Sequence, residues 1–276
     1  MWLDEIVKIE KVRDIKIEGE VGDRLLVLYK TGELVELNVR DKTVDDEILI
    51  KNVEQFDNDG DRVVFLTKQE LELETDSLIN DGLSTKKTEW QVRAYRVGES
   101  DSYVVKRFEL EQDEVLGDVK LATMRYFQES YVGIVRGDSF EVYSKTNWVT
   151  SDDEMEKVFD EKTDFAVAKL KKRGKGMVFE IIGGNGEASV FDIEAMTTTQ
   201  VNTKNTGWVD EYMRYRLVDG KLSVLDYDGL NERVLVDSDV VSGRVVVISG
   251  NGRYLYYFSK KTAKDSTEVL VRERIN

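Results

Sequence analysis

The segment Gly22–Leu28, GDRLLVL, returns 38 residues later as Gly60–Leu66, GDRVVFL. In both copies a glycine turn precedes a run of apolar residues, which is the pattern of a buried β-strand. Each copy leads into a stretch in which glutamate and leucine alternate, Glu33–Val39 in the first and Glu70–Glu74 in the second. Alternation is typical of a strand with one face in water. The chain therefore contains a repeated unit of short antiparallel strands.

Weaker copies of this unit continue to the C-terminus. An apolar strand, a glycine turn and a second apolar strand recur at Tyr131–Tyr143, Met177–Ile193, Tyr215–Tyr227 and Val245–Phe258. Six units in 276 residues average about 46 residues each, which is the length of a four-stranded propeller blade. The sequence predicts an all-β fold, a six-bladed β-propeller that forms a single domain over residues 1–276. We expect its blades to begin near residues 13, 53, 119, 164, 207 and 241.

The two ends of the chain predict how the propeller closes. Glu5–Glu10 is a spare alternating strand before the first unit, whereas the last unit offers only three strands, Val245–Ser249, Arg253–Ser259 and Thr267–Ile275. If the N-terminal strand pairs into the last blade, no long edge is left unpaired. One helix candidate, Asp152–Phe159, is too short to stand alone.

One segment carries a family resemblance. Leu222–Asn231, LSVLDYDGLN, followed by Val234–Val236, resembles the six-bladed TolB-like propeller family, whose blades often carry an Asp-aromatic-Asp-Gly turn. Gly250–Phe258 is similar to the same family. The rest of the chain matches the family only in the regular recurrence of its strand-and-turn units. The resemblance implies a scaffold that binds a ligand or a protein, in the cell envelope or outside the cell, and it supplies no catalytic residue. The residues themselves leave the compartment undetermined.

The composition excludes several classes of function. Forty basic against 55 acidic residues give a net charge of −15, which disfavours binding to nucleic acid or to an anionic membrane surface. No stretch approaches 18 uninterrupted apolar residues, so we expect no insertion into a membrane. The chain has no cysteine, histidine or proline, which excludes disulfides, thiolate catalysis and an imidazole base. A sequence that lacks three of the common amino-acid types also leaves open that the protein is engineered. We expect a monomer without a cofactor.

Three aspartates form the best metal candidate, and it is a weak one. Asp57, Asp59 and Asp61 lie in a short acidic loop with Gly60, and calcium prefers several carboxylate oxygens from such a loop. A plain turn explains the same residues.

Three tryptophans form the candidate ligand-binding site. Trp90, Trp148 and Trp208 are spaced by 58 and 60 residues. Equivalent positions on different blades would place the indoles on one face, where they could stack on a sugar or grip a peptide. Alternatively, each tryptophan packs between neighbouring blades.

Three functions stay open. The first is a non-enzymatic scaffold or binding module for a protein or peptide ligand. The second is a carbohydrate-active enzyme with a carboxylate pair in the central channel, since glycoside hydrolysis needs only two carboxylates. The third is an engineered scaffold with no natural ligand. We favour the first, and expect no enzyme, because the chain lacks the side chains of a Ser-His triad or a thiolate.

Overall fold

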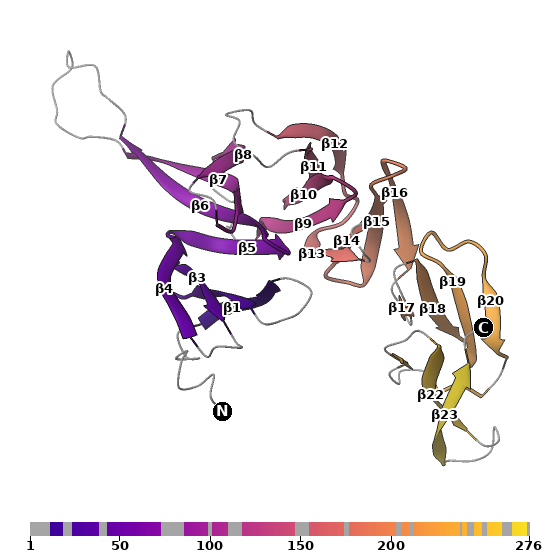
Figure 1. Ribbon diagram of the computed structural model, residues 1–276. Coiled ribbons are helices and arrows are strands. Elements are labelled where there is room, and N and C mark those ends of the chain that lie inside the picture. The colour runs from indigo at the N-terminus through magenta and orange to yellow at the C-terminus, as the bar shows by residue number, and fades with distance from the viewer. Residues whose placement is uncertain are drawn as a thin grey trace. The chain divides into compact units, whose positions relative to one another are not determined.

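The structure is a computed structural model of the chain. It describes residues 12–18, 24–38, 43–72, 86–98, 101–109, 118–146, 155–173, 177–202, 206–209, 212–237, 239–241, 246–249, 253–260 and 267–274. These residues form β-strands and turns, and they include no α-helix (Figure 1). The chain divides into two compact units, Met1–Asp164 and Phe165–Asn276.

The first unit contains three four-stranded antiparallel sheets. The first sheet comprises β1 (Val12–Glu18), β2 (Arg24–Tyr29), β3 (Leu34–Asn38) and β4 (Thr43–Ile50). The second comprises β5 (Val53–Asp59), β6 (Arg62–Glu72), β7 (Lys86–Arg96) and β8 (Ser102–Phe108). The third comprises β9 (Lys120–Tyr126), β10 (Glu129–Arg136), β11 (Ser139–Lys145) and β12 (Glu156–Lys162).

The second unit contains two four-stranded sheets and one of three strands, counted over the described residues. The fourth sheet comprises β13 (Val167–Arg173), β14 (Val178–Gly183), β15 (Glu187–Asp192) and β16 (Thr197–Asn202). The fifth comprises β17 (Thr206–Trp208), β18 (Met213–Val218), β19 (Lys221–Asp226) and β20 (Arg233–Val236). The sixth comprises β21 (Val247–Ile248), β22 (Tyr254–Lys260) and β23 (Glu268–Arg274).

Within each sheet the strands lie in chain order, so each sheet is an up-and-down meander. The sheets begin at residues 12, 53, 120, 167, 206 and 247, close to the predicted starts of the six units. The all-β prediction is confirmed. The predicted closing strand, Glu5–Glu10, lies outside the described residues, and in the sixth sheet β23 is the edge strand.

As expected, the short segment Asp152–Phe159 forms no helix over its described residues, 155–159. Glu156–Phe159 belongs to strand β12, in which Phe159 pairs with Val142 of β11 and its ring lies 6.1 Å from that of Phe140. Strand pairing and aromatic packing therefore override the weak local preference. The rest of the candidate, residues 152–154, lies outside the described part of the chain.

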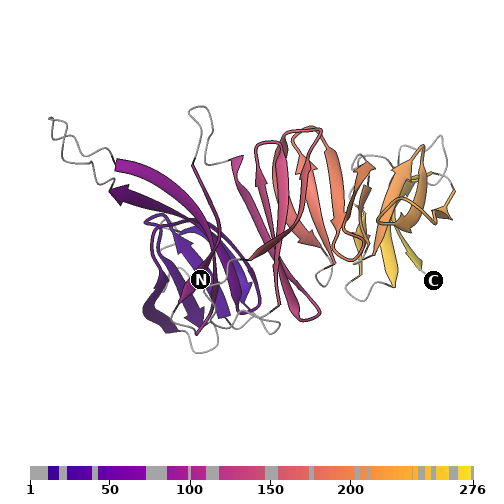
Figure 2. The ribbon, with the colours of Figure 1, turned by 90° about the horizontal axis from the view of Figure 1, so that it is seen from above.

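The hairpin of β6 and β7 is longer than its neighbours. Its pairing runs from Arg62 with Arg96 to Glu72 with Lys86, whereas β5 and β8 pair with only part of it. The hairpin consequently extends beyond the rest of its sheet (Figures 1 and 2).

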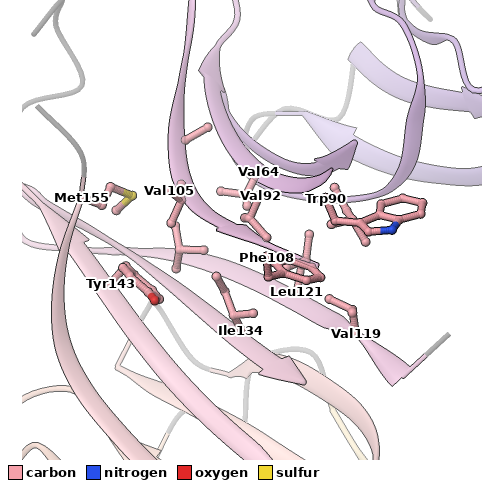
Figure 3. Packing of buried hydrophobic residues seen from close by; sticks show 13 residues of the cluster. Val64, Trp90, Val92, Val105, Phe108, Val119, Leu121, Ile134, Tyr143 and Met155 are labelled. Carbon is pink, nitrogen blue, oxygen red and sulfur yellow. The ribbon is translucent and has the colours of Figure 1, made fainter. Parts of the chain in front are cut away.

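The cores form between the faces of consecutive sheets. One cluster joins the second and third sheets (Figure 3), and its buried members are Val64, Leu66, Trp90, Val92, Ala94, Val105, Phe108, Val119, Leu121, Val132, Ile134, Tyr143 and Met155. A second cluster, which includes Leu26, Val53 and Phe65, joins the first and second sheets. In the second unit, residues such as Leu222, Val224 and Leu255 join the fifth and sixth sheets. Apolar burial between sheet faces therefore links each of these pairs of sheets.

Candidate functional site

Two of the three aspartates predicted as metal ligands, Asp57 and Asp61, form hydrogen bonds with different partners. Asp57 is buried on β5 and accepts hydrogen bonds from Lys16 Nζ at 2.6 Å and from the Thr123 backbone amide at 2.8 Å. Asp61 lies in the following turn and accepts from Arg96 Nε at 2.7 Å. The described residues contain no group of three or more Asp, Glu, His or Cys side chains that could hold a metal ion. Asp57 and Asp61 thus pair with different cations, Lys16 and Arg96.

Trp90 and Trp208 do not occupy equivalent positions in their sheets. Trp90 lies on β7, the third strand of its sheet, and is only 8% exposed within the core cluster (Figure 3). Trp208 lies on β17, the first strand of its sheet. Trp148 lies outside the described residues. Trp90 thus shows the packing role that was the alternative to ligand binding.

Trp208 is part of a polar cluster between the fourth and fifth sheets. Its Nε1 donates to Glu180 Oε1 at 2.9 Å, and the second oxygen of that buried carboxylate accepts from Arg173 Nε at 2.7 Å. The guanidinium carbons of Arg173 and Arg214 lie 5.8 and 5.4 Å from the indole centroid, a distance at which cations are attracted to the ring. Trp208 therefore joins two sheets through side-chain contacts.

Arg214 carries a buried charge in this cluster. Burial lowers the pKa of its guanidinium and repulsion by Arg173 adds to this, whereas attraction by Glu180 opposes the shift. Arg214 Nη2 also donates to Thr206 Oγ1 at 2.8 Å. The hydrogen bond to the Thr206 hydroxyl and the attraction of the Glu180 carboxylate offset part of the cost of burying this charge.

A second polar junction lies along the first strands of the first unit. Arg13 and Lys16 of β1 donate hydrogen bonds to Glu54 and Asp57 of β5. Asp57 also accepts a hydrogen bond from the backbone amide of Thr123 on β9. Strands β5 and β9 lie side by side (Figure 1) although each is the edge strand of its own sheet. A backbone amide on the outer side of an edge strand has no neighbouring strand to bond to, so it needs another hydrogen-bond acceptor. The Asp57 carboxylate supplies that acceptor for β9.

A polar pocket of about 350 Å³ opens where the first and second sheets meet. Strands β1, β5 and β6 contribute Arg13, Glu54 and Lys68. The turn between β2 and β3 contributes Lys30, Thr31 and Gly32, and the residue preceding β5 by one position, Asn52, completes the lining.

Backbone hydrogen bonds fix the turn that borders the pocket. Gly32 has φ of 85°, a left-handed conformation that suits glycine, and its amide donates to Tyr29 O at 3.0 Å. Its carbonyl accepts from the Val53 amide at 2.8 Å, which joins the turn to the start of the second sheet. On the other side, Thr67 Oγ1 donates to Asn52 O at 2.8 Å. The pocket is therefore bordered by backbone that is held on both sides.

The pocket is positively charged within an acidic chain. Three of its side chains are cationic and one, Glu54, is a carboxylate, whereas the whole chain carries −15. Arg13 Nη1 donates to Glu54 Oε2 at 2.8 Å and to the Glu54 carbonyl at 2.9 Å, so the guanidinium is oriented before any ligand arrives. Several N–H donors around one hollow suit an anionic group. A glycoside hydrolase would need two carboxylates in its cleft, and this lining has one.

The sequence did not indicate the pocket. Arg13, Asn52 and Lys68 are distant in sequence and share no motif, so only the pairing of strands brings them together.

Comparisons with known proteins give no family. No protein-family model matches the chain, and no curated protein matches it. A crystal structure of a mitotic checkpoint complex has a TM-score of 0.48 at 15% identity over 96% of this chain and 74% of the other. An oligogalacturonate lyase in complex with manganese has a TM-score of 0.47 at 9% identity over 92% of this chain and 74% of the other. At these values, neither protein's activity says anything of this chain. In the described residues, no helix is long and apolar enough to cross a membrane.

Proposed function

We propose that this chain is a β-propeller-type module that binds a protein or peptide and catalyses no reaction. The pocket between the first and second sheets carries the proposal, because its polar lining is set on strands and a fixed turn. Its volume of about 350 Å³ holds one or two side chains of an extended segment, and ligand pockets commonly start near this size. Binding groups held on rigid elements lose little freedom when a ligand arrives.

The propeller architecture is part of the proposal. Four-stranded meanders in chain order are the form of propeller blades, and the first strands β1, β5 and β9 of consecutive sheets meet as they would around an axis. A sixth sheet with β23 at its edge leaves room for the N-terminal strand to complete a closed ring of six blades. The TolB-like resemblance of Leu222–Asn231 supports the same arrangement.

Selection from a random peptide library tests the binding function. The whole chain is used as bait beside the double variant Lys30→Glu, Lys68→Glu, which reverses two charges of the pocket. Lys162→Glu is the control, since this lysine is 82% exposed on β12 in the third sheet. We expect the wild-type chain and the control to enrich the same peptides, and the double variant to lose them. Circular dichroism verifies that all three proteins are folded.

Two outcomes contradict the proposal. If no peptide is enriched by the wild-type chain, it is not a peptide-binding module. If the double variant enriches the same peptides, the pocket is not the site of binding.

A further inference from the structure

We propose that the pocket recognises a carboxylate of an acidic peptide segment, and this inference rests on the proposed binding function. A carboxylate can come from a side chain or from a free C-terminus. Both sources present the same two oxygens, and the experiment below separates them.

The donors of the pocket suit a carboxylate. Lys30 and Lys68 each carry an ammonium with three N–H donors, and Arg13 carries a planar guanidinium. These side chains approach from the turn after β2, from β6 and from β1, so they surround the hollow from three elements. Charge-assisted hydrogen bonds from such groups to carboxylate oxygens are stronger than neutral ones.

The negative charges favour a singly charged ligand over a phosphate. Glu54 lies in the lining, and its repulsion doubles when the ligand carries two negative charges. The acidic remainder of the chain acts in the same direction, although at physiological ionic strength its effect is screened over about 8 Å. A dianion would double its attraction to the three cations as well as its repulsion from Glu54, but the cost of removing its water rises with the square of its charge. A monoanion therefore enters the pocket with the smaller penalty.

The neutral residues of the lining suit a peptide. Asn52 offers a side-chain amide that can both donate to and accept from a peptide group, and Thr31 offers a hydroxyl. None of the lining side chains is apolar, so the pocket offers little to an apolar small molecule. A short polar segment with one carboxylate therefore suits the cationic and neutral side chains of the lining.

Nuclear magnetic resonance titration of the isotope-labelled whole chain tests this assignment. The backbone amides of Gly32 and Asn52 report on the pocket, and four capped pentapeptides serve as probes. The first is acetyl-Gly-Gly-Glu-Gly-Gly-amide, the second has Gln in place of Glu, and the third has Gln with a free C-terminus. The fourth has phosphoserine at the central position. We expect saturable shifts with the first or the third peptide, which identifies the source of the carboxylate, and none with the second.

The variants set the expected size of the effect. Lys68→Gln should weaken binding of the carboxylate peptide by about tenfold, because one charge-assisted hydrogen bond is lost. Lys162→Gln should leave it unchanged. Equal shifts with the Gln-amide peptide, or tighter binding of phosphoserine, would overturn the inference. If library peptides bind through the pocket but the carboxylate peptides do not, the inference fails while the proposed function stands.

Discussion

Individual polar side chains join neighbouring sheets in this protein. Asp57 contacts Lys16 in the first sheet and the Thr123 amide in the third. Lys106 on β8 forms an ion pair with Glu141 on β11, and thus connects the second and third sheets as well. Because these carboxylates are largely buried, each needs its partners in place. The joints therefore depend on particular residues.

Asp57→Asn tests this dependence. The amide oxygen can still accept from Thr123, but the charge that pairs with Lys16 is lost. We expect the free energy of unfolding to fall by about 1–3 kcal/mol, measured by urea denaturation. Asp61→Asn is the matched control, because both side chains of the Asp61–Arg96 pair are more than 40% exposed, and it should cost less than about 1 kcal/mol. Equal losses in the two variants would contradict a special role for Asp57.

The turn between β9 and β10 is an element under strain. Tyr126 pairs with Glu129, so the turn has two central residues, and the first of them, Phe127, has φ of 52° and is 79% exposed. A bulky side chain is unfavourable in this region, where glycine is preferred. The ring gains only an edge contact with Tyr126, at 4.5 Å between centroids.

Replacing Phe127 separates backbone strain from the aromatic contact. Phe127→Gly and Phe127→Ala both remove the contact with Tyr126, but only glycine relieves the left-handed conformation. We expect the glycine variant to be more stable than the alanine variant by about 1 kcal/mol, measured by thermal or chemical unfolding. The usual order, with alanine the more stable, would show that the turn is not strained.

At the scale of the whole molecule, the predicted closure of the ring depends on what pairs with the edge of the sixth sheet. The sixth sheet has β23 at its edge, and Leu270 on that strand is 63% exposed. An exposed strand edge invites pairing with another chain, and a closing strand prevents it. We expect Glu5–Glu10 to cover this edge.

Engineered cysteines can detect that pairing, because the chain has no cysteine of its own. Val7→Cys is combined in turn with Val269→Cys and with Val271→Cys, since a disulfide requires Cα atoms about 4.4–6.8 Å apart. We expect one of the two combinations to form an intramolecular disulfide, seen as a shift on a non-reducing gel. Val7→Cys with Leu230→Cys, on the turn after β19, is the control. Absence of a cross-link in both combinations would contradict closure by this strand.

The sequence predicted the sheets better than the site. Turn glycines such as Gly60 and the alternation of apolar residues are local signals, so the starts of the six sheets could be placed to within a few residues. The pocket could not be foreseen, because Arg13, Lys30 and Lys68 meet only through the packing of two sheets.

The spacing of the tryptophans did not show on which strands they lie. A distance in sequence counts residues, and the strands and turns of the sheets differ in length, so equal spacings can fall on different strands. Trp90 consequently lies on a third strand and Trp208 on a first strand.

The joints between sheets also limit how such a protein can be rearranged. Lys16 and Asp57 connect one pair of sheets, Lys106 and Glu141 the next, and Trp208 with Glu180 a third. A unit that is duplicated or moved to another position would have a new neighbouring sheet. Its buried carboxylate would then lack a lysine partner, or its tryptophan would lack a carboxylate to accept the indole hydrogen bond. The sheets joined by these three contacts are therefore not interchangeable, because recombination at these junctions would leave a buried polar side chain without its partner.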